Sequence, residues 1–155
     1  MDTTALLEQF CSAVEQRDGK AFAGLFTEDG LYHDVFYGTF AGHARIAEMI
    51  DDWFYRAARD FRWEMFRPVS DGRTLYAYYT FSYVSTLPEA EGRRVGFEGV
   101  SIMTLRDGKI AEYREVANTG PGFVQMGFAP ERIAKILSRE GEHLRQQPEW
   151  QRHVG

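Results

Sequence analysis

The sequence predicts an α+β fold, in which N-terminal helices cover one face of a curved, cone-shaped antiparallel β-sheet and one more helix follows at the C-terminus. Two observations predict this class. Apolar residues recur at three- and four-residue spacing in the first third of the chain, and they alternate with polar residues from 61 to 118. Two Asp-Gly pairs, at 71–72 and 107–108, divide the alternating region into hairpins.

Three helices are expected before the long strands. Thr3 or Thr4 can cap the first, and Asp18-Gly19 ends it. A short helix over 20–26 and a turn over 27–30 precede the first strand, 31–38, and a loop over 39–42 follows that strand. The third helix spans 43–58. The apolar stripe of the first helix is Leu6, Leu7, Phe10, Cys11 and Val14.

Four longer strands follow, over 61–69, 74–86, 93–105 and 109–118. The strand over 74–86 carries rings on both faces, so only one face can pack against the helices. We expect the other face to meet a second subunit, which predicts a homodimer through the open sheet face. The rings of this strand are Tyr76, Tyr78, Tyr79, Phe81 and Tyr83.

Residues 1–119 are expected to form one domain, and 120–155 a C-terminal loop and helix that pack on the same domain or on a partner subunit. The loop contains Phe123, Met126 and Phe128, which could cap the mouth of the cone. Pro130 suits the first turn of the final helix. The polar tail from 147 is expected to be loose.

Composition and charge narrow the functional class. The net charge is -5 and no run of Lys or Arg occurs, which argues against nucleic-acid partners. Cys11 is the only cysteine, so neither a disulfide nor a cysteine zinc site is expected. No apolar segment reaches membrane-spanning length and no signal peptide is recognised, so a cytoplasmic location without membrane contact is expected. Histidines at metal-ligand spacing and phosphate-binding loops are also missing, which predicts no metal and no cofactor.

Asp34 is the first candidate catalytic residue, because it is an acid among rings in the stretch "GLYHDVFYG". Alternation places Tyr32 on its face, while His33 points the other way and is a weaker catalytic candidate. Burial among rings would raise the pKa of Asp34 and suit it to proton transfer. The alternative is that Asp34 caps a turn at the end of the strand.

Glu115 and Tyr113 are the next catalytic candidates. A three-residue turn over 106–108 would set Tyr113 opposite Ser101 and Glu115 opposite Gly99, all on one face. Gly99 and Ser101 are small, which would leave room for a ligand. The alternatives are a two-residue turn, which shifts these partners by one position, and a structural ion pair of Glu115 with Arg62 or Arg67.

The segments 13–30, 32–46 and 103–115 resemble the nuclear transport factor 2-like superfamily, and within it the SnoaL-like and ketosteroid isomerase-like enzymes. The resemblance covers residues 4–119. It implies an apolar pocket inside the cone and a general base at Asp34, where ketosteroid isomerases carry their catalytic Asp. Those enzymes also use a Tyr and a second Asp as oxyanion donors. Here Phe10 and Ser101 (or Val100) stand at these positions, which argues against the steroid mechanism.

The resulting hypothesis is a cofactor-independent isomerase, dehydratase or cyclase that acts on a small hydrophobic carbonyl or hydroxyl compound. Asp34 would move the proton, and Tyr32, Tyr113 or Ser101 would stabilise the oxyanion. A non-catalytic binder of a hydrophobic ligand and a protein-interaction module are the alternatives. The expected ligand contacts, for which plain core packing is the alternative, are Phe10, Trp53, Phe81, Phe97, Ser101 and Met103.

Overall fold

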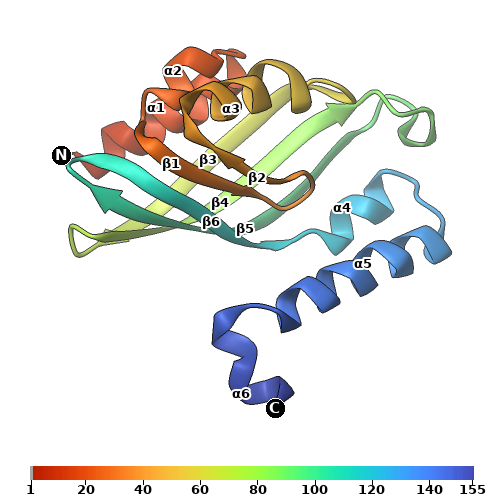
Figure 1. Cartoon of the computed structure of the whole chain (residues 1–155). Helices are drawn as coiled ribbons and strands as arrows, with labels where there is room; N and C mark the ends of the chain where they lie inside the picture. Colours follow the sequence, from red (N-terminus) through yellow and green to blue (C-terminus); the bar gives the residue numbers. More distant parts are fainter. Residues whose placement is uncertain (1) are drawn as a thin grey trace.

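The computed structural model describes residues 2–155, which form one curved six-stranded sheet with helices on either side (Figure 1). The strands lie in the order β2-β1-β6-β5-β4-β3. This arrangement confirms the predicted α+β class. The strands are β1 Phe26–Asp34, β2 Gly38–Ala41, β3 Ala58–Ser70, β4 Thr74–Ser85, β5 Arg94–Arg106 and β6 Lys109–Asn118.

Helices α1 (Thr3–Glu15), α2 (Gly19–Ala23) and α3 (Gly42–Glu48) cover one face of the sheet (Figure 1). The prediction of a threonine cap on α1 is wrong. The cap is Asp2, whose carboxylate accepts a hydrogen bond from the Thr4 amide at 2.9 Å. The predicted apolar stripe of α1 is buried in full, so the helix packs as its periodicity indicates.

Two segments expected to be irregular are strands. Residues 27–30 belong to β1, and residues 39–41 belong to β2, which pairs antiparallel with β1. On its other side β1 pairs with β6, and this pair is parallel. Polar residues and glycines obscured both segments in the sequence pattern. Strand β2 lies at the sheet edge, and residues 27–30 of β1 lie in a register irregularity between Phe26 and Leu31, so neither segment shows a regular alternation of apolar residues.

The third helix ends earlier than the predicted residue 58. After α3 the chain makes one π-helical turn, Met49–Trp53, in which the Phe54 amide donates to the Met49 carbonyl at 3.0 Å. Strand β3 already begins at Ala58. Apolar residues continue through this junction, so their spacing could not reveal where helix gives way to strand.

The β5–β6 hairpin closes through the two-residue turn Asp107-Gly108, and the predicted three-residue loop is wrong. Both turn residues have positive φ, 51° and 75°, which favours a tight hairpin turn. A register shift beside the turn then sets Ser101 opposite Glu115 and Met103 opposite Tyr113. The predicted partners differ by two residues, and a shift of two keeps every side chain on its face. The predicted shared face is therefore confirmed.

Aromatic rings fill the space between the sheet and the helices. Phe10 packs against Phe22 at 4.7 Å and against Trp63 at 5.1 Å between ring centroids. Tyr32 and Tyr113 stack at 4.5 Å with their planes 9° apart. None of these three residues, Phe10, Tyr32 and Tyr113, exposes any surface. The base of the cone is consequently packed with side chains.

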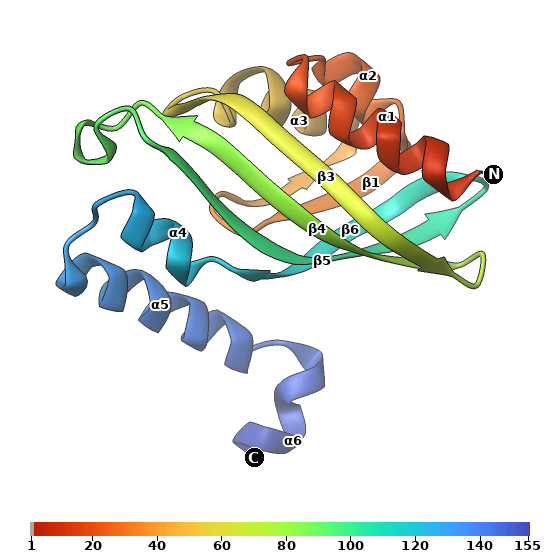
Figure 2. The same ribbon diagram turned by 180° about the vertical axis from the view of Figure 1, so that it is seen from behind.

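The C-terminal segment crosses to the other side of the sheet (Figure 2). Helix α4 (Gly120–Gln125) is held to β5 by Gln125, whose side chain exchanges hydrogen bonds with the Gly96 backbone at 2.8 and 3.1 Å. Helix α5 (Pro130–Arg145) follows and buries none of its side chains. The tail, expected to be loose, contains a 3-10 turn, Pro148–Trp150, and a short helix α6, Gln151–Val154. Over the described residues, no helix has both the length and the apolarity needed to cross a membrane.

Candidate active site

Asp34 and Glu115 lie beside each other on neighbouring strands. The parallel strands β1 and β6 pair Tyr32 with Tyr113. Two residues further along each strand come Asp34 and Glu115, and alternate residues share a face, so both acids lie on the side of the two tyrosines. Neighbouring strands are about 4.8 Å apart, which brings the carboxyl groups close enough to interact electrostatically. The charge of Asp34 accordingly raises the pKa of Glu115 further, beyond the larger effect of burial.

Asp34 ends β1 and holds the turn into β2. Its Oδ2 accepts hydrogen bonds from the amides of Phe36 at 2.9 Å and Tyr37 at 3.0 Å, which is the turn-capping role considered as an alternative. Within residues 2–155 its Oδ1 accepts no hydrogen bond. Burial raises the pKa of Asp34 to about 6, although the two amides act to lower it. One oxygen is thus structural, and the other is free to take a proton near neutral pH.

Glu115 is held by a short chain of hydroxyl groups. Its Oε2 accepts a hydrogen bond from Tyr113 at 3.0 Å, and the Tyr113 oxygen lies 2.9 Å from the Ser101 hydroxyl. Because the Tyr113 hydroxyl donates its hydrogen bond to Glu115, the Ser101 hydroxyl must be the donor to the Tyr113 oxygen. Burial and then the Asp34 charge raise the pKa of Glu115 to about 7, against a lowering by the Tyr79 and Tyr113 hydroxyls.

The structure does not contain the ion pair between Glu115 and Arg62 or Arg67 that was considered as an alternative. Among the described residues, none of the ion pairs includes Glu115. Arg67, one of the two arginines considered, instead stacks on the Tyr78 ring at 5.1 Å, on the opposite face of the sheet. Glu115 is therefore a second acid of the site, with hydroxyl groups as its partners.

Two buried hydroxyl groups lie beside the acids, those of Tyr32 and Tyr79, and neither makes a hydrogen bond of normal geometry among residues 2–155. The Tyr79 hydroxyl nevertheless lies close enough to Glu115 to lower the pKa of that acid. Both tyrosines are fully buried. Burial, followed by the Glu115 charge, raises the pKa of both well above the usual value, so both keep their protons. A buried hydroxyl without a partner costs about 1–3 kcal/mol, so these two are suited to a polar atom of a ligand.

Tyr79 is the residue that the sequence pattern did not single out for this site. It lies opposite Gly99 on β5. A Cβ atom at Gly99 would be 2.6 Å from the Tyr79 hydroxyl oxygen and 2.6 Å from the Val116 carbonyl oxygen. The space that Gly99 was expected to leave for a ligand is therefore filled by the Tyr79 ring. A glycine in mid-strand opposite a tyrosine is the signal that could have revealed this.

Aromatic side chains surround the acids where the sheet opens to solvent. Phe36 and Tyr37 follow Asp34 and are each 41% exposed. Phe36 packs edge-on against Phe97 at 5.8 Å and against Phe123 of α4 at 6.0 Å. Helix α4 therefore contacts this rim, and its role as a cap of the cone stays a prediction. We call Phe36, Tyr37, Tyr83 and Phe97 the rim rings.

The remaining predicted residues divide between core, rim and outer face. Phe10 and Met103 are fully buried and Phe81 nearly so, which places them in the core. Trp53 is partly buried and packs edge-on against Tyr37 at 5.5 Å. His33 points away from the acids, with Nε2 2.7 Å from Glu112 and Nδ1 2.9 Å from Thr39. A direct role in ligand binding or catalysis for these residues stays a prediction.

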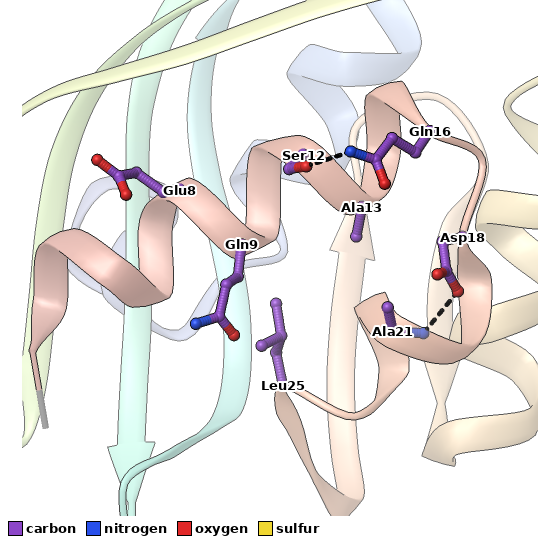
Figure 3. Close-up of a pocket in the computed structure, with 8 residues that line it drawn as sticks. All are labelled: Glu8, Gln9, Ser12, Ala13, Gln16, Asp18, Ala21 and Leu25. Carbon is purple, nitrogen blue, oxygen red and sulfur yellow. Dashed lines mark hydrogen bonds between the residues drawn. The ribbon is translucent and has the colours of Figure 1, made fainter.

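Two shallow hollows lie elsewhere, on the outside of the molecule. One lies between α1 and α2 and is lined by polar side chains such as Gln9, Ser12 and Asp18 (Figure 3). The other is formed by charged residues around Asp29 and Arg106. Neither includes Asp34 or Glu115, so the apolar pocket expected inside the cone stays a prediction. In the described part of the chain, no cluster of three or more His, Cys, Asp or Glu is placed to hold a metal ion.

A family model described as a SnoaL-like domain matches residues 7–113. The match includes Asp34 and Tyr79 and stops two residues before Glu115. No curated protein matches the chain.

Three solved structures show how widely the fold is shared. A protein with a ketosteroid isomerase-like fold from Catenulispora acidiphila, solved with trimethylamine, is 14% identical, with a TM-score of 0.72 over 81% of this chain and 95% of its own. An epoxide hydrolase from Mycobacterium tuberculosis is 19% identical, with a TM-score of 0.63 over 90% and 99%. A protein assigned as a polyketide cyclase from Xanthomonas campestris is 21% identical, with a TM-score of 0.64 over 79% and 95%. At these identities the likeness establishes the fold alone.

Proposed function

The chain belongs to the SnoaL-like domain family, and we propose that it is a cofactor-independent enzyme that moves a proton on a small hydrophobic carbonyl or hydroxyl compound. The reaction class is isomerisation, dehydration or aldol-type cyclisation. The observation that carries the proposal is the adjacent pair Asp34 and Glu115, with pKa values raised to about 6 and about 7. Acids that titrate near neutral pH can take up and return protons under physiological conditions.

The two acids have different roles because their surroundings differ. Asp34 has an oxygen, Oδ1, that accepts no hydrogen bond within residues 2–155, so it is the general base. Glu115 titrates at higher pH beside the Asp34 charge, so it holds the proton and is the general acid. Since the two charges interact, the pair titrates as a unit in two steps. Tyr113 and Ser101 orient Glu115 through their hydrogen bonds.

The substrate oxygen is bound by Tyr32 and Tyr79 in this proposal. Both hydroxyl groups are protonated and buried, so they are preorganised donors. The Tyr32 hydroxyl has no partner among the described residues, and the Tyr79 hydroxyl lies beside Glu115. The steroid isomerase donors have no counterpart here, because Phe10 stands at one of those positions and packs on Tyr113 at 5.2 Å. The names of the Mycobacterium and Xanthomonas neighbours support chemistry on small organic molecules in this fold.

Hydrogen–deuterium exchange tests the proposal without knowledge of the final product. Small ketones and hydroxy ketones are incubated with the protein in D2O, and loss of the proton next to the carbonyl is followed by NMR. Asp34→Asn should slow this exchange by about 10²–10⁴-fold, because it removes the general base. Asparagine can still accept from the Phe36 and Tyr37 amides, so the turn is kept. Glu112→Gln, on the opposite face, is the matched control. Exchange at the wild-type rate in Asp34→Asn would refute the mechanism.

A non-catalytic binder or a dimeric interaction module of the same fold is the second candidate. The ring-packed base of the cone favours the interaction module, because little of the interior is left for a ligand. The neighbour solved with trimethylamine supports binding of a small molecule by the fold. A wild-type protein that binds compounds of the panel but accelerates no exchange would favour this candidate.

A further inference from the structure

Among residues 2–155, no cationic group forms an ion pair with Asp34 or Glu115. The pKa of Asp34 is shifted by burial and by two backbone amides. The pKa of Glu115 is shifted by burial, by the charge of Asp34 and by two tyrosine hydroxyls. No Lys, Arg or His contributes to either shift. Arg56 approaches the rim at Trp53, which it covers at 3.8 Å, but its guanidinium is bound to Asp52 at 2.7 Å. His33 is bound to Glu112 on the other face. The chain therefore leaves the negative charge of this site unpaired.

Among the described residues, no Lys or Arg stacks on a rim ring, although the charge of Arg56 reaches Tyr37 and acts to lower its pKa. The charge of Asp34 reaches two of them, since it contributes to the raised pKa values of Tyr37 and Tyr83. Arginines cover rings elsewhere in the described chain, at Phe40, Trp53, Tyr55, Tyr78 and Phe128. None of those contacts uses a rim ring. Ring faces attract cations, and an alkylated nitrogen gains most from such contacts.

We propose that the ligand of this site carries a small alkylammonium group, which lies between the Asp34 and Glu115 carboxylates and the rim rings. This inference rests on the site assigned under the proposed function and specifies its substrate class: the carbonyl or hydroxyl compound also bears a positive nitrogen. The buried hydroxyls of Tyr32, which is unpartnered among the described residues, and of Tyr79, beside Glu115, are placed for the oxygen function of the same molecule. Such a ligand supplies the positive charge that no described residue provides to the two acids.

Choline and its uncharged carbon isostere, 3,3-dimethylbutan-1-ol, form a matched pair of probes, because they differ only in the charge at the quaternary atom. Binding of each is measured by calorimetry at pH 8 and at pH 5. Choline should bind at least about tenfold more tightly than the isostere at pH 8. At pH 5 both acids are protonated, so choline should lose about tenfold in affinity while the isostere is unchanged.

Charge-neutralising variants identify the residues responsible. Asp34→Asn and Glu115→Gln should each weaken choline binding about tenfold at pH 8, and Glu112→Gln, an acid on the opposite face, should leave it unchanged. Thermal unfolding confirms that each variant is folded. Equal affinity for choline and the isostere, no binding of either at millimolar concentration, or full choline affinity in Asp34→Asn overturns the inference.

The exchange assay separates this inference from the proposed function. A preference for choline without exchange of any ketone leaves the alkylammonium site standing and removes the proton-transfer role. Exchange that depends on Asp34, without a preference for choline, supports the proton-transfer role and removes the alkylammonium site. Each proposal therefore has a result that contradicts it alone.

Discussion

At the residue scale, Asp34 uses its two carboxylate oxygens for different purposes. Oδ2 accepts the amides of Phe36 and Tyr37 and holds the turn, while Oδ1 accepts no hydrogen bond within residues 2–155. The structural and catalytic interpretations of this residue are therefore compatible. The turn also fixes the carboxyl group in place, and a general base needs a fixed position to meet its proton at hydrogen-bonding distance.

Gly99 positions a second residue of the site, because only a glycine allows the Tyr79 ring to lie across β5. Gly99→Ala should displace this ring and move its hydroxyl away from Glu115. The pKa of Glu115 should then rise above about 7, since the Tyr79 hydroxyl acts to lower it. We expect a stability loss of about 1–3 kcal/mol from overpacking, measured by denaturant unfolding, and slower ketone exchange.

Two further variants separate chemistry from packing at this position. Tyr79→Phe removes only the hydroxyl, so it should slow exchange and raise the pKa of Glu115 without a loss of stability. Gly120→Ala is the control, because a Cβ there meets no atom within 4 Å. If Gly99→Ala leaves both the Glu115 pKa and the exchange rate unchanged, Tyr79 has no part in the site.

At the element scale, the long strands were predictable and the short ones were not. Alternation from 61 to 118 is long enough to identify strands and faces, and both Asp-Gly turns lie where the pattern ends. Strand β2 has four residues, begins with Gly38 and is followed by Gly42, and its single buried residue is Phe40. The register of β5 against β6 was missed because a local shift at Thr104 and Leu105 depends on backbone pairing, which side-chain pattern does not encode.

The part of the candidate site that could be predicted is the part that follows from strand parity, the alternation of side chains between the two faces of a strand. Parity placed Tyr32 with Asp34 on one face of their strand and Tyr113 with Glu115 on one face of theirs, and the structure brings the two pairs together. It could not show the direction in which a long side chain leans, so Tyr79 was missed. Nor could it separate a core ring from a ligand contact, because Phe10 and Met103 have the same polarity as a pocket lining.

At the scale of the whole molecule, the outer face of the sheet and helix α5 expose apolar side chains, although the C-terminal segment reaches this face at Arg114, which bonds to Glu149 and Gln147. Tyr76, Val100 and Val116 are 48%, 37% and 68% exposed, and α5 buries no side chain. The same face of the sheet carries charges of both signs, among them Arg62, Glu64 and Glu98, so it is complementary to itself. We propose that a second copy of the chain covers this face, in an isologous dimer.

Light scattering after size exclusion tests the dimer. The wild-type protein should have twice the mass of the 17.8 kDa chain at micromolar concentration. Val116→Glu should yield a folded monomer, because it places a charge in the apolar centre of the interface. Val124→Glu on α4, where the side chain is 67% exposed, is the control and should stay dimeric. A wild-type monomer at tens of micromolar would contradict the proposal.

The central claim is that Asp34 and Glu115 form one acid–base pair. NMR titration of the labelled side-chain carboxyl groups tests it most directly, with Asp34→Asn as the partner experiment. We predict two coupled steps near pH 6 and pH 7 in the wild type, and a lower Glu115 pKa in Asp34→Asn, since the charge that raises it is gone. Titration of both groups near pH 4, or a Glu115 pKa that does not respond to Asp34→Asn, would contradict the account.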